Sequence, residues 1–386
     1  MPTDRRLIYA AAFIRALGIG LLGVLFALNL SKQGLHAGQI GFLVAIGLAG
    51  SACGTLFVSF WADRLGHRNS LLLLSGCAIA GALGLALFQN FGWLAAACFL
   101  GMVNAMGRER GALFTLEQTI LPATATGHDR TKALAWYNAL LDSGQAIGSL
   151  LAALPLLAGR SFGLYAALAA ASFFLYMGLS RKVEEGRATS WRRVSPASRK
   201  IITRLSLLFG FDSLAGGFLP GSLIAYWFFK RFGLGEEMLG PLFFFGHIAT
   251  AFSYLGAAWL AKRIGLVRTM VFTHTPANLC LIAIPFVPSV AWAAALYLLR
   301  ECLVEMDVPT RQSYVMAVVK PEERTVAAGV TNLTRLAAWT VAPTLAGVAM
   351  RSLALGFPLV VGGSMKILYD AMLFLSFRHL KPPEES

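Results

Sequence analysis

Residues 118–138 of the chain read QTILPATATGHDRTKALAWYN, and residues 312–332 read QSYVMAVVKPEERTVAAGVTN. Identical residues recur in the two stretches, always 194 residues apart. They include Gln118 and Gln312, Arg130 and Arg324, Thr131 and Thr325, Ala133 and Ala327, and Asn138 and Asn332. A fixed offset of about half the chain indicates two equivalent halves in the same order. In a hydrophobic protein, parallel halves are typical of a transporter whose substrate site lies between them.

The composition is that of a protein that faces lipid. Of the 386 residues, 57% are hydrophobic and 13% are charged, whereas soluble domains carry about 25% charged residues. Much of the surface must therefore contact a bilayer. The net charge of +14 would suit a nucleic-acid partner, but nearly all basic residues lie in short loops between apolar runs, which argues against that class.

Twelve apolar segments are long enough to span a membrane, which takes about 20 residues. They run over 7–30, 38–60, 69–89, 92–117, 134–158, 161–180, 203–229, 237–260, 267–288, 291–315, 327–350 and 355–377. Spanning segments must satisfy their own backbone hydrogen bonds, so each should be helical. We expect an all-α membrane protein with two pseudo-symmetric six-helix bundles, residues 1–180 and 203–386, joined by a basic cytoplasmic linker at 181–202.

Lys and Arg are unevenly shared between alternate loops. The loops on the side of both termini hold 21 of them, and the opposite loops hold five. Basic residues accumulate on the cytoplasmic side of membrane proteins, so we expect both termini to lie in the cytoplasm. We expect a multi-pass protein of the inner or plasma membrane.

Residues 59–68, SFWADRLGHR, lie between the second and third apolar segments. They resemble the cytoplasmic loop signature of the major facilitator superfamily, G-x-x-x-D-R-x-G-R-R, with Ser59 and His67 as departures. A second, weaker copy, AKRIG at 261–265, has Lys262 in place of the acid. The resemblance extends to the whole topology and implies the twelve-helix fold of that superfamily.

The resemblance also implies a cytoplasmic gate. Asp63 would dock at the start of the eleventh segment, where free N–H groups and the helix dipole favour a carboxylate. Arg64 and Arg68 would pair with Glu117; the alternative is that these charges only set topology. Polar residues in the repeated loops would complete the gate. Its expected members are Asp63, Arg64, Gly66, Arg68, Glu117, Arg130, Asn138, Arg324 and Asn332.

Gly144-x-x-x-Gly148, followed by Ser149, looks like part of the small-residue motif on the fifth helix of proton-driven exporters. Small residues four apart also serve plain helix packing. Both interpretations stay open, and the first favours export.

Ionisable side chains within the apolar segments are candidate functional residues because they are costly in lipid. Arg15, Asp142, Asp212 and Arg335 each lie near mid-membrane depth, which suggests the ion pairs Arg15–Asp142 and Asp212–Arg335. Purely structural pairs are the alternative. The expected substrate and proton pathway comprises Arg15, Arg108, Arg110, Asp142, Asp212, Glu301, Glu305 and Arg335.

Helical spacing separates two faces on the tenth segment. Arg300, Asp307 and Arg311 alternate in sign and can neutralise one another, whereas Glu301 and Glu305 share a face without a cation. A carboxylate without a partner in a dry environment can hold a proton, so Glu305 and Glu301 are the first candidates for proton carriers. The same spacing puts Asn104, Arg108 and Gly111 in one stripe of a continuous fourth helix.

We therefore expect a secondary transporter of a small organic solute, working by alternating access and coupled to protons, most simply as an exporter. Proton-coupled uptake is the alternative, and a membrane sensor or scaffold is a third class. The sequence contains no phosphate-binding loop, no catalytic motif and no metal-ligand spacing, so we expect no enzyme activity and no cofactor. Its partners would be the solute, protons and lipid, and the protein would act as a monomer. His247 and His274 would serve ordinary packing, and Pro220-Gly221 would let the seventh segment bend.

Overall fold

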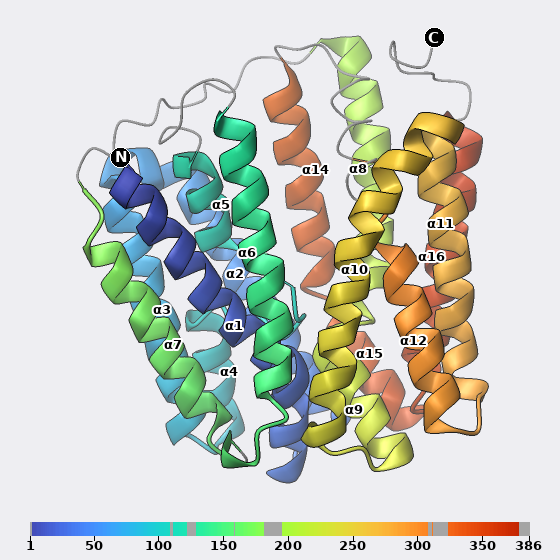
Figure 1. Cartoon of the computed structure of the whole chain (residues 1–386), viewed down its shortest axis with the longest axis horizontal. Coiled ribbons are helices and arrows are strands. Elements are labelled where there is room, and N and C mark those ends of the chain that lie inside the picture. Colours follow the sequence, from blue (N-terminus) through green and yellow to red (C-terminus); the bar gives the residue numbers. More distant parts are fainter. Residues whose placement is uncertain are drawn as a thin grey trace. The chain divides into compact units, whose positions relative to one another are not determined.

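The computed structural model describes residues 2–108, 111–121, 129–157, 159–180, 195–307, 311 and 323–377. Within these ranges the chain is helical and contains no strand (Figure 1). Each of the twelve expected segments contains at least one helix. Seven helices of the described part are long and apolar enough to cross a membrane. The all-α membrane fold is therefore confirmed.

The described residues form two compact units. The first lies within Met1–Ala188 and Pro220–Phe244, and the second within Thr189–Leu219 and Phe245–Ser386. The short segment 220–244, which the sequence places in the second bundle, thus packs with the first unit. Lys32 at the end of the first helix holds this segment through an ion pair with Glu236, with Nζ and Oε1 2.9 Å apart.

In the first unit the helix α1 is the central element. It packs against α6, α7 and α9, and its side chains from Ile8 to Leu30 are mostly buried. The helices of this unit are α1 (Pro2–Lys32), α2 (Ala37–Leu65), α3 (His67–Leu87), α4 (Phe91–Leu100), α5 (Ala112–Ile120), α6 (Asp129–Leu151), the 3-10 turn η2 (Pro155–Leu157), α7 (Ser161–Met177), α9 (Gly221–Phe232) and the start of α10 (Glu236–Ile264).

In the second unit α8 packs against α14 and α16, and α11 packs against α12 and α16. Phe209, Met270 and Tyr369 belong to its apolar core. The helices are α8 (Pro196–Gly217), the rest of α10, α11 (Leu266–Ala283), the 3-10 turn η4 (Ile284–Phe286), α12 (Val290–Val304), α14 (Arg324–Trp339), α15 (Ala342–Ser352) and α16 (Phe357–Phe377).

The fourth expected segment is not one helix. Residues 101–111 separate α4 from α5, so the predicted polar stripe through Arg108 is wrong. The neighbouring helix α2 lies very close to this break, as a Cβ on Gly47 would lie 2.3 Å from the Val103 carbonyl oxygen. Gly107, inside the break, adopts φ +78°, a conformation that favours glycine.

The seventh segment also breaks, as its glycines and Pro220 predicted. The amides of Gly221 and Ser222 at the start of α9 donate to the carbonyls of Met106 and Ala105, at 3.1 and 3.2 Å. An unsatisfied backbone carbonyl is costly in a membrane. The backbone amides at the second break therefore satisfy the backbone carbonyls at the first. These hydrogen bonds hold α9 in the first unit.

Two further segments depart from continuous helices. The tenth was expected over 291–315, but α12 ends at Val304. The eleventh divides into α14 and α15 on either side of Thr340 and Val341, just before Pro343, which cannot donate a helical hydrogen bond.

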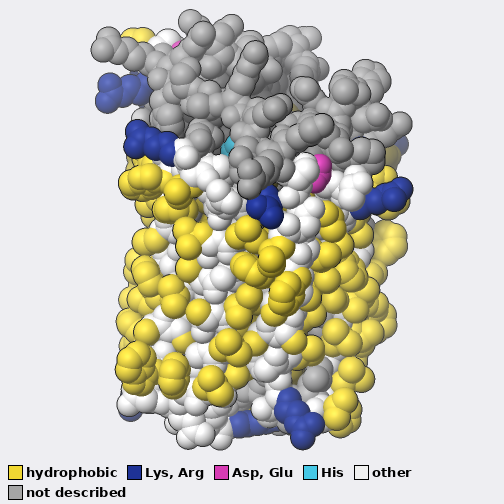
Figure 2. Space-filling model, turned by 90° about the vertical axis from the view of Figure 1, so that its left-hand side faces the viewer, with side chains coloured by type: hydrophobic (Ala, Val, Ile, Leu, Met, Phe, Trp, Pro, Cys, Tyr) yellow, Lys and Arg dark blue, Asp and Glu magenta, His cyan; other side chains and the backbone are white. Residues whose placement is uncertain are grey.

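One face of the molecule shows how the surface suits a bilayer. In Figure 2 hydrophobic side chains cover the middle of this face, and Lys and Arg side chains gather near its two ends. Large apolar side chains such as Leu87, Phe174 and Phe252 are exposed. Exposed apolar surface on this scale is expected where lipid replaces water.

Candidate functional site

A buried ion pair lies inside the first unit. The Glu117 carboxylate is fully buried and accepts from the Arg15 guanidinium at 2.6 Å. Tyr137 and Tyr176 donate their hydroxyls to the same carboxylate at 2.7 and 2.6 Å. Tyr176 in turn accepts from Arg15 at 2.6 Å. We call these four residues, from α1, α5, α6 and α7, the Arg15 cluster.

This geometry corrects the predicted role of Glu117. Its described partners all belong to the Arg15 cluster, so it does not pair with Arg64 or Arg68. Arg64 is exposed, and Arg68 donates to the Met177 carbonyl oxygen at 2.7 Å. The reason is the helix break, because α5 starts anew at Ala112 and its inward face is not the one that a continuous helix would give.

A larger buried network lies inside the second unit. Its members come from α8, α11, α16 and the chain after α12, and each is at most 7% exposed. We call it the Asp212 cluster; it comprises Asp212, His274, Asp307, Arg311, Lys366 and Asp370.

The first half of this network is a continuous line of contacts. Asp370 Oδ1 lies 2.8 Å from His274 Nδ1, and His274 Nε2 lies 3.4 Å from Lys366 Nζ. Lys366 Nζ donates to Asp212 Oδ1 at 2.8 Å. Thr275 donates to the other oxygen of Asp370 at 3.1 Å. The imidazole therefore stands between a carboxylate and an ammonium group.

Arg311 completes the network from the other side. Its Nη1 lies 3.3 Å from Asp212 Oδ2 and 2.7 Å from Asp307 Oδ2. The predicted charge neutralisation between Asp307 and Arg311 is confirmed. Asp212 thus lies between two cations.

The charges of the Asp212 cluster do not balance unless a proton is added. Three carboxylates face the two permanent cations Arg311 and Lys366. Two further charges act on the cluster with opposite signs, Arg335 on Asp212 and Glu305 on Arg311, and they cancel in the sum over the described residues. With a neutral His274 the sum is −1, and with a protonated His274 it is zero. A buried charge without compensation is costly.

Other predicted partners differ from those found. Asp212 pairs with Lys366 and Arg311, and Arg335 donates instead to the neighbouring Ser213 at 3.0 Å. The guanidinium of Arg335 also lies 5.0 Å from the ring centre of Trp339.

Glu301 forms an ion pair, although its helix face was predicted to carry no cation. Arg300, the preceding residue, turns its guanidinium onto this carboxylate, and Thr250 of α10 donates to it at 3.2 Å. Glu305 lies one residue beyond the end of α12. The prediction of an unpaired Glu301 is therefore wrong.

The other residues predicted for the gate and the pathway do not belong to either cluster. Gly66 joins α2 to α3 at φ +87°, and Asn138 and Asn332 are exposed. Asp142 lies half-buried on α6, and the carbonyl of Arg108 accepts from Asn104 at 2.7 Å. Arg110 and the side chains of Asp63, Arg130 and Arg324 lie outside the described residues.

Sequence reasoning missed the role of His274, Lys366 and Asp370. The usable signal was Lys366 and Asp370, four residues apart in an otherwise apolar segment. That spacing puts both on one helix face. The partner on α11 could not be read from the sequence, because it depends on how α11 packs against α16.

The two clusters occupy equivalent positions of the repeat with opposite charge. Glu117 precedes Gln118, and Arg311 precedes Gln312, its counterpart in the repeat. Arg15 and Asp212, their partners, are 197 residues apart. Each half thus pairs its first helix with the chain at its fourth helix, and the signs are exchanged.

Two buried tyrosines, Tyr176 of α7 and Tyr369 of α16, give a matched test. Tyr176 holds both members of the ion pair, whereas the buried Tyr369 hydroxyl has no hydrogen-bond partner among the described residues. We expect Tyr176→Phe to lower the free energy of unfolding by about 1–3 kcal/mol, because it removes buried hydrogen bonds to charged groups. Tyr369→Phe should change it little. Thermal or denaturant unfolding of both variants in detergent measures this, and equal losses would contradict the assignment.

Among the residues that the structure describes, no group of three or more His, Cys, Asp or Glu side chains is arranged to hold a metal ion. The ionisable side chains of the two clusters instead contact one another. Their chemistry is that of charge pairing and hydrogen bonding.

The sequence profile of the Major Facilitator Superfamily matches residues 8–343. The chain belongs to the major facilitator superfamily. Members of this superfamily are transporters, and the chain shares their fold. It is 24% identical over 422 aligned positions to the uncharacterized membrane protein YJR124C of Saccharomyces cerevisiae, covering 97% of this chain and 94% of that protein. A local match, 27% identical, covers 38% of this chain and 37% of the uncharacterized MFS-type transporter YcaD of Salmonella arizonae.

Solved structures of superfamily members have the same fold. An auto-inhibited POT family peptide transporter superposes with a TM-score of 0.77 at 13% identity, covering 99% of this chain and 98% of that one. The nucleoside transporter NupG gives 0.75 at 13% identity, covering 97% and 99%. The human organic anion transporter MFSD10 gives 0.66 at 16% identity, covering 96% and 99%. At these identities the likeness establishes the fold alone.

Proposed function

We propose that this member of the superfamily is a proton-coupled secondary transporter of a small organic solute, and that the Asp212 cluster carries the coupling proton. The observation that supports this most is the charge of the cluster, which is −1 without a proton on His274 and zero with one. In a dry interior that difference favours proton uptake. The proposal replaces Glu305 and Glu301 with His274 as the first candidate carrier.

A proton on His274 would change the contacts of the cluster. The imidazolium would keep Asp370 at 2.8 Å and would repel the Lys366 ammonium, now 3.4 Å away. Lys366 would then bind Asp212 alone. Asp212 lies on α8, which three residues separate from α9. Protonation would therefore act beside the break in this segment, where a hinge can form.

The rest of the transport cycle follows the superfamily. The two halves would expose a central solute site alternately to each side of the membrane. We propose export as the direction of transport. The pattern that supports it is Gly144-x-x-x-Gly148, which resembles the exporter motif. Uptake is the alternative. The basic loops support cytoplasmic termini in an inner or plasma membrane. We propose a monomer that needs no cofactor and catalyses no reaction.

The solute class is left broad for a physical reason. The solved structures with this fold are described as transporters of peptides, nucleosides, D-xylose or organic anions. These solutes differ in size and charge, so the fold does not select among them.

Reconstituted protein tests the proposal. A ligand screen by thermal stabilisation would first identify a solute, and counterflow in proteoliposomes would then show exchange. We expect an imposed pH gradient to drive accumulation, with its sign giving the direction of transport. Exchange that is indifferent to the gradient would contradict proton coupling, and absence of exchange for every stabilising solute would favour a sensor or scaffold.

His274→Gln tests the proton carrier. This variant keeps a polar side chain but cannot take up a proton, so gradient-driven accumulation should fall to the level of an uncoupler-treated wild type, while counterflow continues. His247→Gln is the matched control, since His247 lies on α10 outside the Asp212 cluster. Undiminished accumulation by His274→Gln would contradict the assignment.

A further inference from the structure

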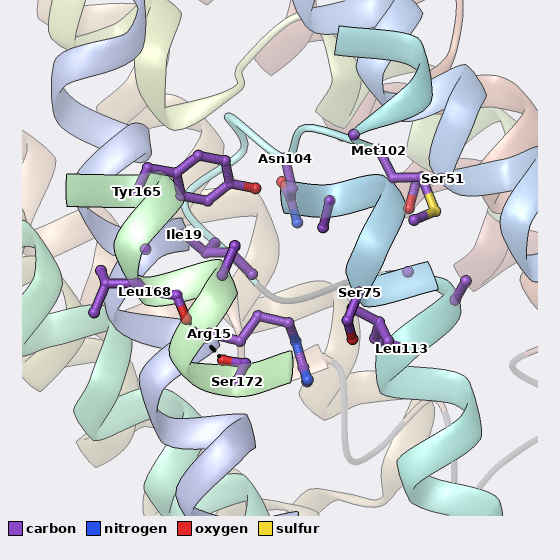
Figure 3. Close-up of a pocket in the computed structure, with 16 residues that line it drawn as sticks. Arg15, Ile19, Ser51, Ser75, Met102, Asn104, Leu113, Tyr165, Leu168 and Ser172 are labelled. Carbon is purple, nitrogen blue, oxygen red and sulfur yellow. Dashed lines mark hydrogen bonds between the residues drawn. The ribbon is translucent and has the colours of Figure 1, made fainter. Parts of the chain in front are cut away.

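A cavity of about 60 Å³ lies inside the first unit. It is bordered by α1, α2, α3 and α7 and by residues on both sides of the break between α4 and α5 (Figure 3). Most of its wall is apolar, and all the residues that line it belong to the first unit. The side chains that supply its polar groups are those of Arg15, Ser51, Ser75, Asn104, Tyr165 and Ser172.

Helix α5 begins at this cavity without a cap. Gly111, Ala112 and Leu113 line the cavity, and among the described residues no side chain caps the start of the helix. The first hydrogen bond of α5 is donated by the Thr115 amide to the Gly111 carbonyl, at 3.0 Å. The amides of Ala112, Leu113 and Phe114 precede it, so they have no acceptor within the helix. Inside a membrane such donors need another acceptor.

A buried hydroxyl on α3 is an independent donor at the same cavity. Ser75 is 2% exposed and lines the cavity, and its hydroxyl has no hydrogen-bond partner among the described residues. Figure 3 shows Ser75, Leu113 and the guanidinium end of Arg15 on the cavity wall. A buried hydroxyl without a partner is unfavourable. Ser75 and the start of α5 therefore favour the same occupant, one that accepts hydrogen bonds.

The charges at the wall favour an occupant that is negative. The start of a helix carries a partial positive charge. Arg15 is the only charged side chain among the described residues that line the cavity. Its partner Glu117 is 0% exposed and lies behind it, outside the lining. The ion pair therefore turns its positive end to the cavity, as α5 does.

The size of the cavity limits what can bind. A water-sized group needs about 10–15 Å³ of such volume, so the cavity has room for a carboxylate group and not for a whole organic solute. Ile19, Met102 and Leu168 line other parts of the wall and suit the carbon atoms next to a carboxylate. The cavity is only partly enclosed, so the rest of a larger molecule can extend out of it.

We propose that the start of α5, Ser75 and Arg15 bind a carboxylate in this cavity, and that this carboxylate is one end of the transported solute. Anions bind readily at helix N-termini, and transporters commonly direct the start of an interrupted helix at an anionic group of the substrate. Binding of a carboxylate is independent of the proposed function. Only its assignment to the solute rests on that function.

Thermal unfolding in detergent with sodium acetate tests the site. A ligand that binds only the folded protein raises its unfolding midpoint as the ligand concentration increases. We expect acetate to raise the midpoint at neutral pH, and acetamide, an uncharged molecule of the same shape, to have little effect. No shift with acetate, or equal shifts with the two compounds, would overturn the proposal.

Two buried serines of α3 give a matched pair of variants. Ser70 is 0% exposed and its hydroxyl also lacks a partner among the described residues, but Ser70 does not line the cavity. Ser75→Ala should weaken acetate binding about tenfold, because it removes one hydrogen bond to a charged group. Ser70→Ala should leave the acetate dependence unchanged. Equal acetate dependence in the two variants would overturn the site.

A filled cavity should lose the effect of acetate. Ala78 lines the cavity, and Ala80, on the same helix, is exposed at the surface. Ala78→Leu should abolish the difference between acetate and acetamide, and Ala80→Leu should retain it. A folded Ala78→Leu variant with the wild-type difference would show that acetate acts elsewhere.

The solute that counterflow identifies then tests the source of the carboxylate. We expect this solute to carry a carboxylate and its methyl ester not to be exchanged. Ser75→Ala should raise the solute concentration for half-maximal exchange about tenfold, and Ser70→Ala should not. A transported solute without a carboxylate would overturn the assignment to the solute, even where acetate binds. Neither result depends on the pH gradient, so both are distinguishable from a failure of proton coupling.

Discussion

Lys366→Met should abolish proton-driven transport and lower the free energy of unfolding by about 3–5 kcal/mol, the usual cost of removing one partner of a buried ion pair. Lys366 is the cation nearest to both Asp212 and His274. Without it, three buried carboxylates would share Arg311 and a histidine. Denaturant unfolding in detergent and accumulation in proteoliposomes measure the two effects.

A second substitution separates charge balance from simple loss of packing. Adding Asp212→Asn to Lys366→Met restores the wild-type net charge of the Asp212 cluster. The double variant should be more stable than the sum of the single effects predicts, because interacting residues are not additive. Strict additivity would contradict a shared network. Lys230→Met, at an exposed lysine, is the control and should change stability by about 0.5 kcal/mol or less.

The sequence predicted the helical membrane fold because its signals are local and strong. Hydropathy locates apolar segments, and the repeat around Gln118 and Gln312 indicates two equivalent halves. The break at residues 101–111 could not be predicted in this way. Glycine is common in continuous membrane helices, and only the close approach of α2 and the donors at the start of α9 make the break favourable.

The candidate site was predicted in part. Burial of Arg15 and Asp212 was expected from their depth, and both lie in ion pairs. The pairings of Arg15 with Glu117 and of Asp212 with Lys366 and Arg311 were not predicted, because pairing depends on the rotation of each helix about its axis. A continuous fourth helix would turn Glu117 toward the gate; the separate helix α5 turns it toward Arg15.

The two clusters differ in net charge. In the Arg15 cluster one arginine balances one carboxylate, so no proton is needed for neutrality. In the Asp212 cluster Asp307 and Asp370 add two carboxylates, and Lys366 adds one cation. The shortfall of one positive charge is why we propose the proton site in the second unit.

Gly148→Val should prevent folding of the first unit, with a loss of about 4 kcal/mol or more. A Cβ at Gly148 would lie 2.1 Å from the Leu17 carbonyl oxygen, and one at Gly20 would lie 2.0 Å from the Gln145 carbonyl oxygen. The backbones of α1 and α6 are thus in contact where they cross. Any side chain at Gly148 must push the helices apart and expose the Arg15 cluster.

Gly163→Val is the matched control, because Gly163 lies in helix α7 with open space around its Cβ position. It should cost only the small difference in helix propensity. Expression level and unfolding in detergent compare the two variants. If Gly148→Val folds as well as Gly163→Val but reverses or abolishes transport, the exporter interpretation of Gly144-x-x-x-Gly148 gains over packing. If it fails to fold, packing accounts for the motif, and the direction of transport has to be established by the pH-gradient experiment alone.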